Sequence, residues 1–299
     1  MKLFLFGDSF GSFTRQSNTK LDMSKTADEN TSWWLQLQKK LGCEKTVNFC
    51  LAGTSLDATQ WKFDTELPNI SKEDYIVVIH TEPSRRWFIK ECPGLTNFQN
   101  FINFPNGEIR WDWIEFMTKN HDYDKDKIKR QVQVARDYCL FVANKEMEML
   151  YGSAIASYFY KYQTKGYKLI NIPAYNIPTV DDWNFGFATT GSLVDIADYE
   201  FVPMNNDYMK AFTTITQGMD GRIGHLSKAN HNILVDKIYN SLTCNSDLLL
   251  EQDFKQEFIT ADNWDEHNDY GLTAGSFKGQ VRERPLGSKF LEKFKKDTK

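Results

Sequence analysis

The sequence has no long hydrophobic run, no excess of basic residues and no paired cysteine motif, and each absence excludes a class of protein. No apolar stretch approaches the roughly 18 residues that a membrane-spanning helix needs. The 36 basic and 40 acidic residues are intermixed and give a net charge of −4. That balance provides no general attraction to nucleic acid. The odd number of cysteines and the lack of CxxC spacing predict reduced, mostly buried thiols, not a disulfide framework or a zinc site. These are Cys43, Cys50, Cys92, Cys139 and Cys244.

The amino-terminal stretch does not read as a secretory signal. "KLFLF" at 2–6 is too short for a signal core, and the chain turns polar at once. We therefore expect synthesis in a cytoplasm. Hydrophobic residues make up 41% of the 299 residues, which is enough to build a core in one large domain or two ordinary ones.

Short apolar runs alternate with amphipathic stretches along the chain. This alternation predicts an α/β fold, a three-layer α/β/α sandwich with a mostly parallel sheet. Strands are predicted at 3–6, 45–52, 74–80 and 167–175, and helices at 30–42, 126–163 and 227–242. We expect one domain over 1–243 with an aromatic-rich insertion at about 88–125, followed by a polar extension over 244–299.

The first predicted strand runs directly into Gly7-Asp8-Ser9. Ligands of open α/β sheets gather beyond the carboxyl ends of the strands, so Ser9 is expected at a binding edge. A serine hydroxyl needs a base and an oxyanion hole to act as a nucleophile. The alternative is that Asp8 and Ser9 only cap the following helix.

Three blocks of sequence, in order, resemble the SGNH or GDSL hydrolase family. They are "FGDSFGS" at 6–12, "VNFCLAGTS" at 47–55 and "GHLSKANHNILVDKIYNSL" at 224–242. The resemblance implies the flavodoxin-like SGNH hydrolase fold. It also implies that Ser9 is the nucleophile, that His225 is the base and that the backbone N–H groups of Ser9 and Gly53 form part of the oxyanion hole.

Two positions depart from the family pattern. Arg222 stands where the aspartate that orients the histidine usually lies, and the nearest acid is Asp220. Either Asp220 reaches the imidazole of His225, or the site is a Ser-His dyad and Asp220 only ends a turn with Gly221.

The other departure is Glu82, which lies about where the family has an oxyanion-binding asparagine. A carboxylate cannot donate a hydrogen bond to an anion. The surrounding "TEPSRRW" at 81–87 resembles a variant block of SGNH-like proteins from tailed phages. On this interpretation Thr81 or Ser84 completes the oxyanion hole.

The same block supplies candidates for substrate binding. Arg85 and Arg86 would bind an anionic or polyhydroxylated substrate, with Asp8 as a further candidate. The alternative interpretation of the block is a surface turn with a solvated arginine pair, held by Trp87.

The remaining polar and aromatic residues point to no second site. We expect His231 to be structural and we expect no metal and no cofactor, because no spacing matches a known metal-binding loop. Four aromatic residues between 87 and 123 could stack on sugar rings, but packing is the favoured interpretation. They are Trp87, Trp111, Trp113 and Tyr123.

Two functions follow as hypotheses. The first is a serine hydrolase that cleaves an ester, an O-acyl or O-acetyl group on a carbohydrate or other small substrate. The second is a non-catalytic SGNH-like binding or structural module, for example in a phage particle. Neither hypothesis involves nucleic acid or a membrane. The viral hypothesis would place the protein in the virion or the host cytoplasm, and the sequence fixes no oligomeric state.

Overall fold

The structure of the protein is a computed structural model. It describes residues 1–11, 33–51, 53–90, 102–103, 108–109, 111, 114–115, 124–175, 189–190, 193, 201–204, 226, 228–244, 246–250, 253–254 and 278–281. The chain divides into two compact units, Met1–Lys20 with Lys45–Phe187, and Leu21–Glu44 with Ala188–Lys299. The boundary expected after residue 243 falls inside the second unit, and the predicted domain division stays a prediction.

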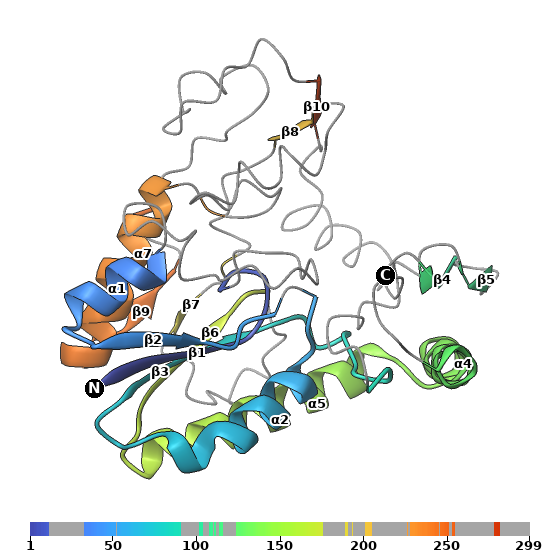
Figure 1. Ribbon diagram of the computed structural model, residues 1–299, viewed down its shortest axis with the longest axis horizontal. Coiled ribbons are helices and arrows are strands. Elements are labelled where there is room, and N and C mark those ends of the chain that lie inside the picture. The colour runs from blue at the N-terminus through green and yellow to red at the C-terminus, as the bar shows by residue number, and fades with distance from the viewer. Residues whose placement is uncertain are drawn as a thin grey trace. The chain divides into compact units, whose positions relative to one another are not determined.

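The first unit contains a four-stranded sheet in which every pairing is parallel (Figure 1). Its strands are β1 (Lys2–Phe6), β2 (Lys45–Asn48), β3 (Tyr75–His80) and β6 (Lys168–Pro173). They lie in the order β2-β1-β3-β6. Taken in chain order this is 2-1-3-4, the beginning of the order found in open doubly wound sheets. The predicted α/β class with a parallel sheet is therefore confirmed.

The central strands are apolar on both faces because both faces are buried. In β1, Phe4 and Phe6 point to one face and Leu3 and Leu5 to the other, and none is more than 3% exposed. This burial explains why the strand reads as an unbroken apolar run and not as an alternating one. The short edge strand β2 is only partly buried.

Two helices, α2 (Leu56–Glu66) and α5 (Lys145–Thr164), pack on one face of the sheet (Figure 1). Phe63 of α2 lies at the centre of their core. Its ring is 5.3 Å from Phe6 of β1 and 5.1 Å from both Phe159 and Tyr162 of α5, centroid to centroid. Edge-on aromatic contacts of this kind add to the hydrophobic stabilisation of the layer.

A third helix, α4 (Lys125–Phe141), belongs to a separate apolar cluster. Ile128, Val132 and Ala135 of α4 pack with Ile89 and Ile114. The described part of the predicted insertion therefore packs against α4. Two short strands lie in the same region, β4 (Ile102–Asn103) and β5 (Glu108–Ile109).

The predicted helix over 126–163 is two helices, α4 and α5, and this is a correction. The break falls at Val142–Asn144, where Asn144 caps α5 by accepting a hydrogen bond from the Met147 N–H at 2.8 Å. Because an asparagine cap satisfies a free N–H only at a helix start, it favours a new helix over a continuous one. Sequence reasoning also missed α2.

The second unit contains the helices α1 (Trp33–Lys40) and α7 (Lys228–Cys244), which contact each other. The Lys40 Nζ atom lies 2.5 Å from an Asp236 carboxylate oxygen and joins the two helices. Short strands complete the described part of this unit. They are β7 (Thr189–Thr190), β8 (Phe201–Met204), β9 (Leu248–Leu249) and β10 (Lys278–Val281).

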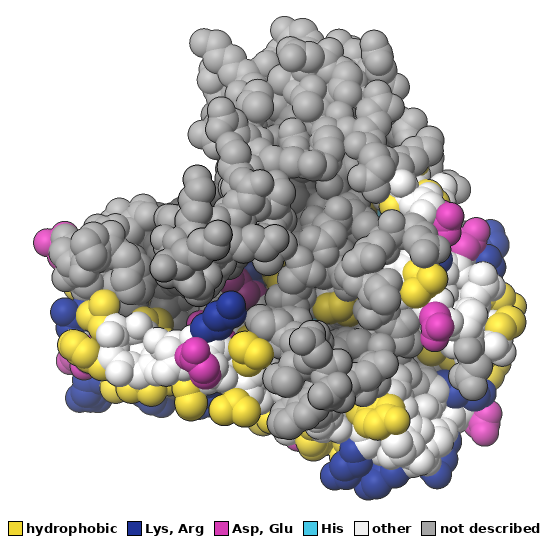
Figure 2. Space-filling model, turned by 180° about the vertical axis from the view of Figure 1, so that it is seen from behind, with side chains coloured by type: hydrophobic (Ala, Val, Ile, Leu, Met, Phe, Trp, Pro, Cys, Tyr) yellow, Lys and Arg dark blue, Asp and Glu magenta, His cyan; other side chains and the backbone are white. Residues whose placement is uncertain are grey.

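The described surface carries both signs of charge. On the face shown in Figure 2, basic, acidic and hydrophobic side chains are mixed. Within the described ranges, no helix is long and apolar enough to cross a membrane.

Candidate active site

The loop that follows β1 carries Ser9 directly beyond the carboxyl end of the strand. Gly7 has a φ of +138°, and a Cβ atom there would lie 2.3 Å from the carbonyl oxygen of Ile79 in β3. Only glycine fits this close approach of two strands. The turn that follows is closed by hydrogen bonds from the Gly11 N–H to the Asp8 carbonyl at 3.2 Å and from the Phe10 N–H to the Asp8 carboxylate at 3.1 Å. Half-buried Ser9 is thus held in a tight Asx-type turn.

The loop that follows β2 is fastened to this turn. The Leu51 N–H donates to the Gly7 carbonyl at 2.8 Å, and the Asn48 side chain donates to the Gly11 carbonyl at 2.8 Å. Gly53 has a φ of +76° in a turn closed by the Thr54 N–H to Leu51 carbonyl bond at 3.0 Å. A positive φ of this size favours glycine at position 53.

Cys50 lies in the same loop, but its thiol is a poor candidate nucleophile. Burial, and after it the charge of Asp8, raises the pKa of the Cys50 thiol well above its ordinary value. A thiol that stays protonated does not attack a carbonyl. Ser9 therefore has no competing thiolate in this loop.

Asp8 and Arg85 form a buried pair between the loops after β1 and β3. Asp8 is fully buried, and its carboxylate lies 3.9 Å from the Arg85 Nη1 atom. The Arg85 Nη2 atom donates to the Tyr175 hydroxyl at 2.9 Å, and Nε lies 3.8 Å from the Glu82 carboxylate. Burial alone would lower the pKa of Arg85, but Tyr175, Asp8 and Glu82 outweigh it and the pKa is raised. Arg85 is therefore a permanent cation that joins three loops of this edge.

Tyr175 extends the network to the loop after β6. Phe10 contacts its ring edge-on at 6.3 Å, and the Arg85 guanidinium lies 5.1 Å from the ring centroid. Burial raises the pKa of the Tyr175 hydroxyl, against the opposing effect of Arg85. Sequence reasoning missed Tyr175, although its place as the last residue of a predicted strand was a signal.

Arg86 points to different partners from those of Arg85. Its guanidinium lies 3.9 Å from the Tyr151 ring centroid, donates to the Tyr138 hydroxyl at 3.2 Å and lies 3.9 Å from the Asp57 carboxylate. Asp57 also accepts the Trp87 N–H at 3.2 Å. These contacts join the loop after β3 to the start of α2 and to α4 and α5.

The three remaining polar residues of this block, Thr81, Glu82 and Ser84, differ in exposure. Thr81 is fully buried, and its hydroxyl has no hydrogen-bond partner among the described residues. Ser84 is partly exposed. The Glu82 carboxylate lies 3.8 Å from the Arg85 Nε atom, and its side chain is 34% exposed.

The structure thus places seven of the nine predicted site residues at the carboxyl edge of one sheet. These seven are Asp8, Ser9, Gly53, Thr81, Ser84, Arg85 and Arg86. His225 and Asp220 lie outside the described residues, as does Arg222. Leu226 is buried, and His231 is a buried residue of α7. Sequence reasoning also missed Asp57, Tyr138 and Tyr151, whose contacts depend on tertiary packing.

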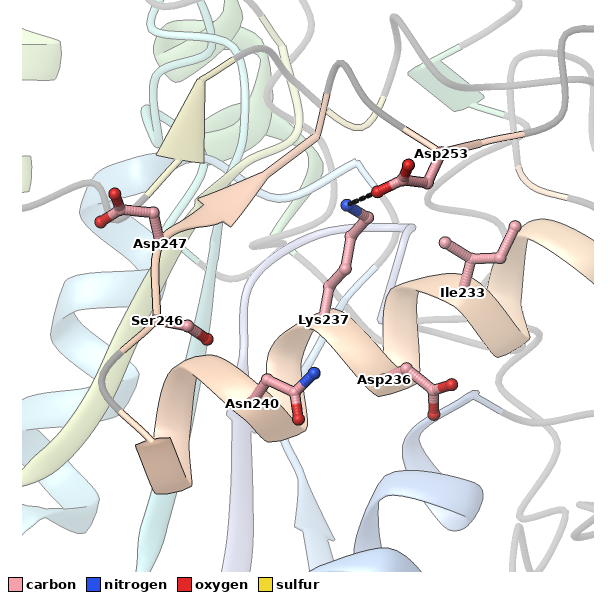
Figure 3. A pocket seen from close by; sticks show the side chains of 7 residues that line it. All are labelled: Ile233, Asp236, Lys237, Asn240, Ser246, Asp247 and Asp253. Carbon is pink, nitrogen blue, oxygen red and sulfur yellow. Dashed lines mark hydrogen bonds and ion pairs between the residues drawn. The ribbon is translucent and has the colours of Figure 1, made fainter.

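A pocket of about 320 Å³ lies elsewhere, between α7 and the segment that follows it (Figure 3). The Lys237 Nζ atom is 3.0 Å from the Asp253 carboxylate, and the side chains of Asp236 and Asp247 point apart (Figure 3). Among the described residues, no group of three or more histidine, cysteine, aspartate or glutamate side chains could hold a metal ion.

Comparison of the chain with protein-family models, with curated proteins and with solved structures gives no match.

Proposed function

We propose that the protein is a serine ester hydrolase of the SGNH type with a three-layer α/β/α fold. One observation carries the proposal. Ser9 lies on the first turn after β1 in a parallel sheet of order β2-β1-β3-β6. In this order the chain reverses its winding between β1 and β3, and doubly wound proteins bind ligands at that point of the carboxyl edge. Ser9 follows β1 and Thr81 follows β3, so the two residues lie on either side of the point where the winding reverses.

The proposed reaction has two steps. The Ser9 hydroxyl attacks the carbonyl carbon of the ester while His225 takes its proton. The tetrahedral intermediate then expels the alcohol, which receives that proton. Water, activated by the same histidine, attacks the acyl-enzyme and releases the acid. Asp220 would hold the imidazole of His225 in the required tautomer.

The developing oxyanion needs hydrogen-bond donors that are already in position. The proposal assigns this role to the backbone N–H groups of Ser9 and Gly53 and to the hydroxyl of Thr81 or Ser84. Two features support it. The Ser9 and Gly53 turns are joined by hydrogen bonds, and the buried Thr81 hydroxyl has no partner among the described residues.

Arg85 and Asp8 take a positioning role in the proposal. The guanidinium nitrogens of Arg85 all face protein partners, and the Asp8 carboxylate holds the turn that presents Ser9. Arg85 lies within 3.9 Å of both Asp8 and Glu82, so Glu82 has a cationic neighbour next to the proposed oxyanion hole. Substrate contacts of Asp8, Arg85 and Arg86 stay predictions, as does the O-acyl or O-acetyl carbohydrate ester as substrate.

The competing proposal is a non-catalytic binding or structural module of the same fold, for example in a phage particle. Glu82 in place of an asparagine favours it, since it removes one family donor. The two proposals differ in whether Ser9 is an activated nucleophile.

Labelling with a fluorophosphonate probe tests this difference, because the probe reacts with serines that a neighbouring base activates. We expect the wild type to be labelled at Ser9 and the Ser9→Ala and His225→Ala variants to remain unlabelled. Ser246→Ala, a change at an exposed serine of the second unit, is the matched control and should label like the wild type. A folded wild-type protein that takes up no probe would contradict the hydrolase proposal and favour the binding module.

A further inference from the structure

Two tryptophans, Trp61 of α2 and Trp87 of the loop after β3, form an aromatic pair beside the candidate site. Their ring centroids are 5.2 Å apart, and the ring planes are inclined by 55°. Trp61 is 53% exposed and Trp87 is partly buried. The Lys90 Nζ atom lies 4.5 Å from the centroid of the Trp87 ring. We refer to Trp61, Trp87 and Lys90 as the tryptophan platform.

Packing of the core does not account for Trp61. The buried residues of α2 are Leu56, Ala58, Thr59 and Phe63, whereas Trp61 is 53% exposed. Tryptophan is also a poorer helix former than the charged residues usual at exposed helix positions. Trp61 is also paired with Trp87, so the two rings together leave an aromatic surface that a ligand could contact.

The platform is anchored to the carboxyl edge that carries Ser9. The Trp87 N–H donates to the Asp57 carboxylate at 3.2 Å, and the Trp87 indole N–H donates to the Ile89 carbonyl at 2.9 Å. Asp57 lies in the first turn of α2. Ser55, two residues after Gly53, caps this helix. The ring of Trp87 is thus fixed in place, and Trp61 lies one helical turn beyond Asp57.

The size and chemistry of the platform favour a saccharide over a protein partner. A tryptophan side chain offers about 150–250 Å² of surface when it is fully buried. Two partly covered rings therefore fall well short of the roughly 800 Å² per partner of a stable protein interface. The negatively polarised faces of indole rings attract the C–H faces of sugar rings. Lys90, whose Nζ atom lies beside the Trp87 ring, adds a donor for a sugar hydroxyl.

We propose that the tryptophan platform binds the saccharide chain of the substrate, with a sugar ring against the exposed face of Trp61. This proposal rests on the proposed function in one respect, because it takes the bound saccharide to be the alcohol part of the ester that the hydrolase cleaves. Saccharide binding itself needs no catalysis and is measured separately.

The test is isothermal titration of the full chain with soluble oligosaccharides, using cellohexaose, xylohexaose, chitohexaose and an oligogalacturonide as probes. For a probe that binds, we expect Trp61→Ala to weaken the affinity about tenfold, as loss of one aromatic stacking contact implies. Trp61→Phe should retain part of the affinity. Trp111→Ala is the matched control, because Trp111 is also exposed, at 42%. Thermal unfolding checks that each variant folds.

Hydrolysis of p-nitrophenyl acetate by the wild type separates the two proposals. This ester has no saccharide part, so its cleavage reports esterase activity without use of the platform. Saccharide binding that depends on Trp61 in a protein without esterase activity would support the platform and contradict the hydrolase. No binding of any probe, or equal losses in Trp61→Ala and Trp111→Ala, would overturn the platform and leave the hydrolase proposal standing.

Discussion

At the scale of single residues, Thr81 gives the sharpest test of the proposed oxyanion hole. Its hydroxyl is buried and has no hydrogen-bond partner among the described residues. Replacement by valine keeps the shape and removes a polar group that makes no described protein contact. We expect Thr81→Val to leave the free energy of unfolding unchanged or to raise it. If the hydroxyl stabilises the oxyanion, kcat for an ester should fall by about 10²–10³.

The measurement pairs urea unfolding with steady-state kinetics on p-nitrophenyl acetate. Ser84→Ala is the companion variant, since Ser84 is the alternative donor. A large loss of kcat in Ser84→Ala with none in Thr81→Val would assign the role to Ser84. A Thr81→Val protein that loses stability would show that the hydroxyl has a structural partner.

The residues of the candidate site differ in how far the sequence could predict them. Ser9 and Gly53 lie in short motifs where the local turn fixes the conformation, so a pattern is enough to find them. The contacts of Arg85 could not be predicted, because its partners Asp8 and Tyr175 follow other strands. Only the register of the sheet brings them together. The interpretation of Arg85 as part of a solvated pair is accordingly wrong, since its side chain is only 10% exposed.

At the scale of elements, the junction of β1 and β3 depends on Gly7. An alanine there would bring its Cβ atom to 2.3 Å from the Ile79 carbonyl oxygen, at a φ of +138°. We expect Gly7→Ala to lower the free energy of unfolding by more than about 4 kcal/mol, because both backbone strain and a clash with another strand oppose it.

Gly166→Ala is the matched control for this change. Gly166 also has a positive φ, of +84°, but a Cβ atom there would meet only the flexible end of Lys72, at 3.9 Å. Gly166→Ala should lower the free energy of unfolding only by the cost of placing a non-glycine residue at positive φ, about 1–2 kcal/mol. Urea unfolding followed by tryptophan fluorescence measures both values. Equal losses in the two variants would show that the close strand contact is not what requires Gly7.

Long buried strands were easier to predict than the other elements of this chain. The strands β1, β3 and β6 were found from apolar runs, because parallel strands buried on both faces leave a continuous signal, whereas the short strands β4, β5 and β7–β10 were not predicted. The helix α2 was missed because the polar residue Thr59 is buried while the apolar residue Trp61 is exposed. Its apolar residues therefore do not repeat every three to four positions as in a regular amphipathic helix. The break before α5 was missed because the helix formers on either side of Asn144 conceal its capping role.

At the scale of the whole molecule, the dependence of folding stability on pH is expected to reflect His80, the last residue of β3. Its imidazole is fully buried, its Nε2 atom lies 2.9 Å from the Asn171 side-chain oxygen, and its ring contacts Phe159 edge-on at 5.3 Å. Asn171 presents an acceptor, so neutral His80 donates from Nε2. Burial lowers the pKa of His80 from 6.5 to about 4, and the bond to Asn171 only partly opposes it.

The sign of the pH effect follows from this lowered pKa. Between pH 6.5 and about pH 4 the histidine is protonated in the unfolded chain but neutral in the folded one. The unfolded state therefore binds the extra proton, and stability falls as the pH drops through this range, by up to about 1.4 kcal/mol per pH unit. Above pH 6.5 the group is neutral in both states and has no effect. The contribution over the whole range is roughly 3 kcal/mol.

Urea unfolding of the wild type and of His80→Gln at several values between pH 4 and pH 8 isolates this contribution. Glutamine does not titrate, and its amide can still donate to Asn171. We expect the variant to start from a lower stability at pH 8 and to lose less on acidification, so that the two curves converge toward pH 4. All other titrating groups are shared by the two proteins and cancel in the difference. Curves that stay parallel would mean that His80 takes up its proton without unfolding, because water or a local opening reaches the carboxyl end of β3.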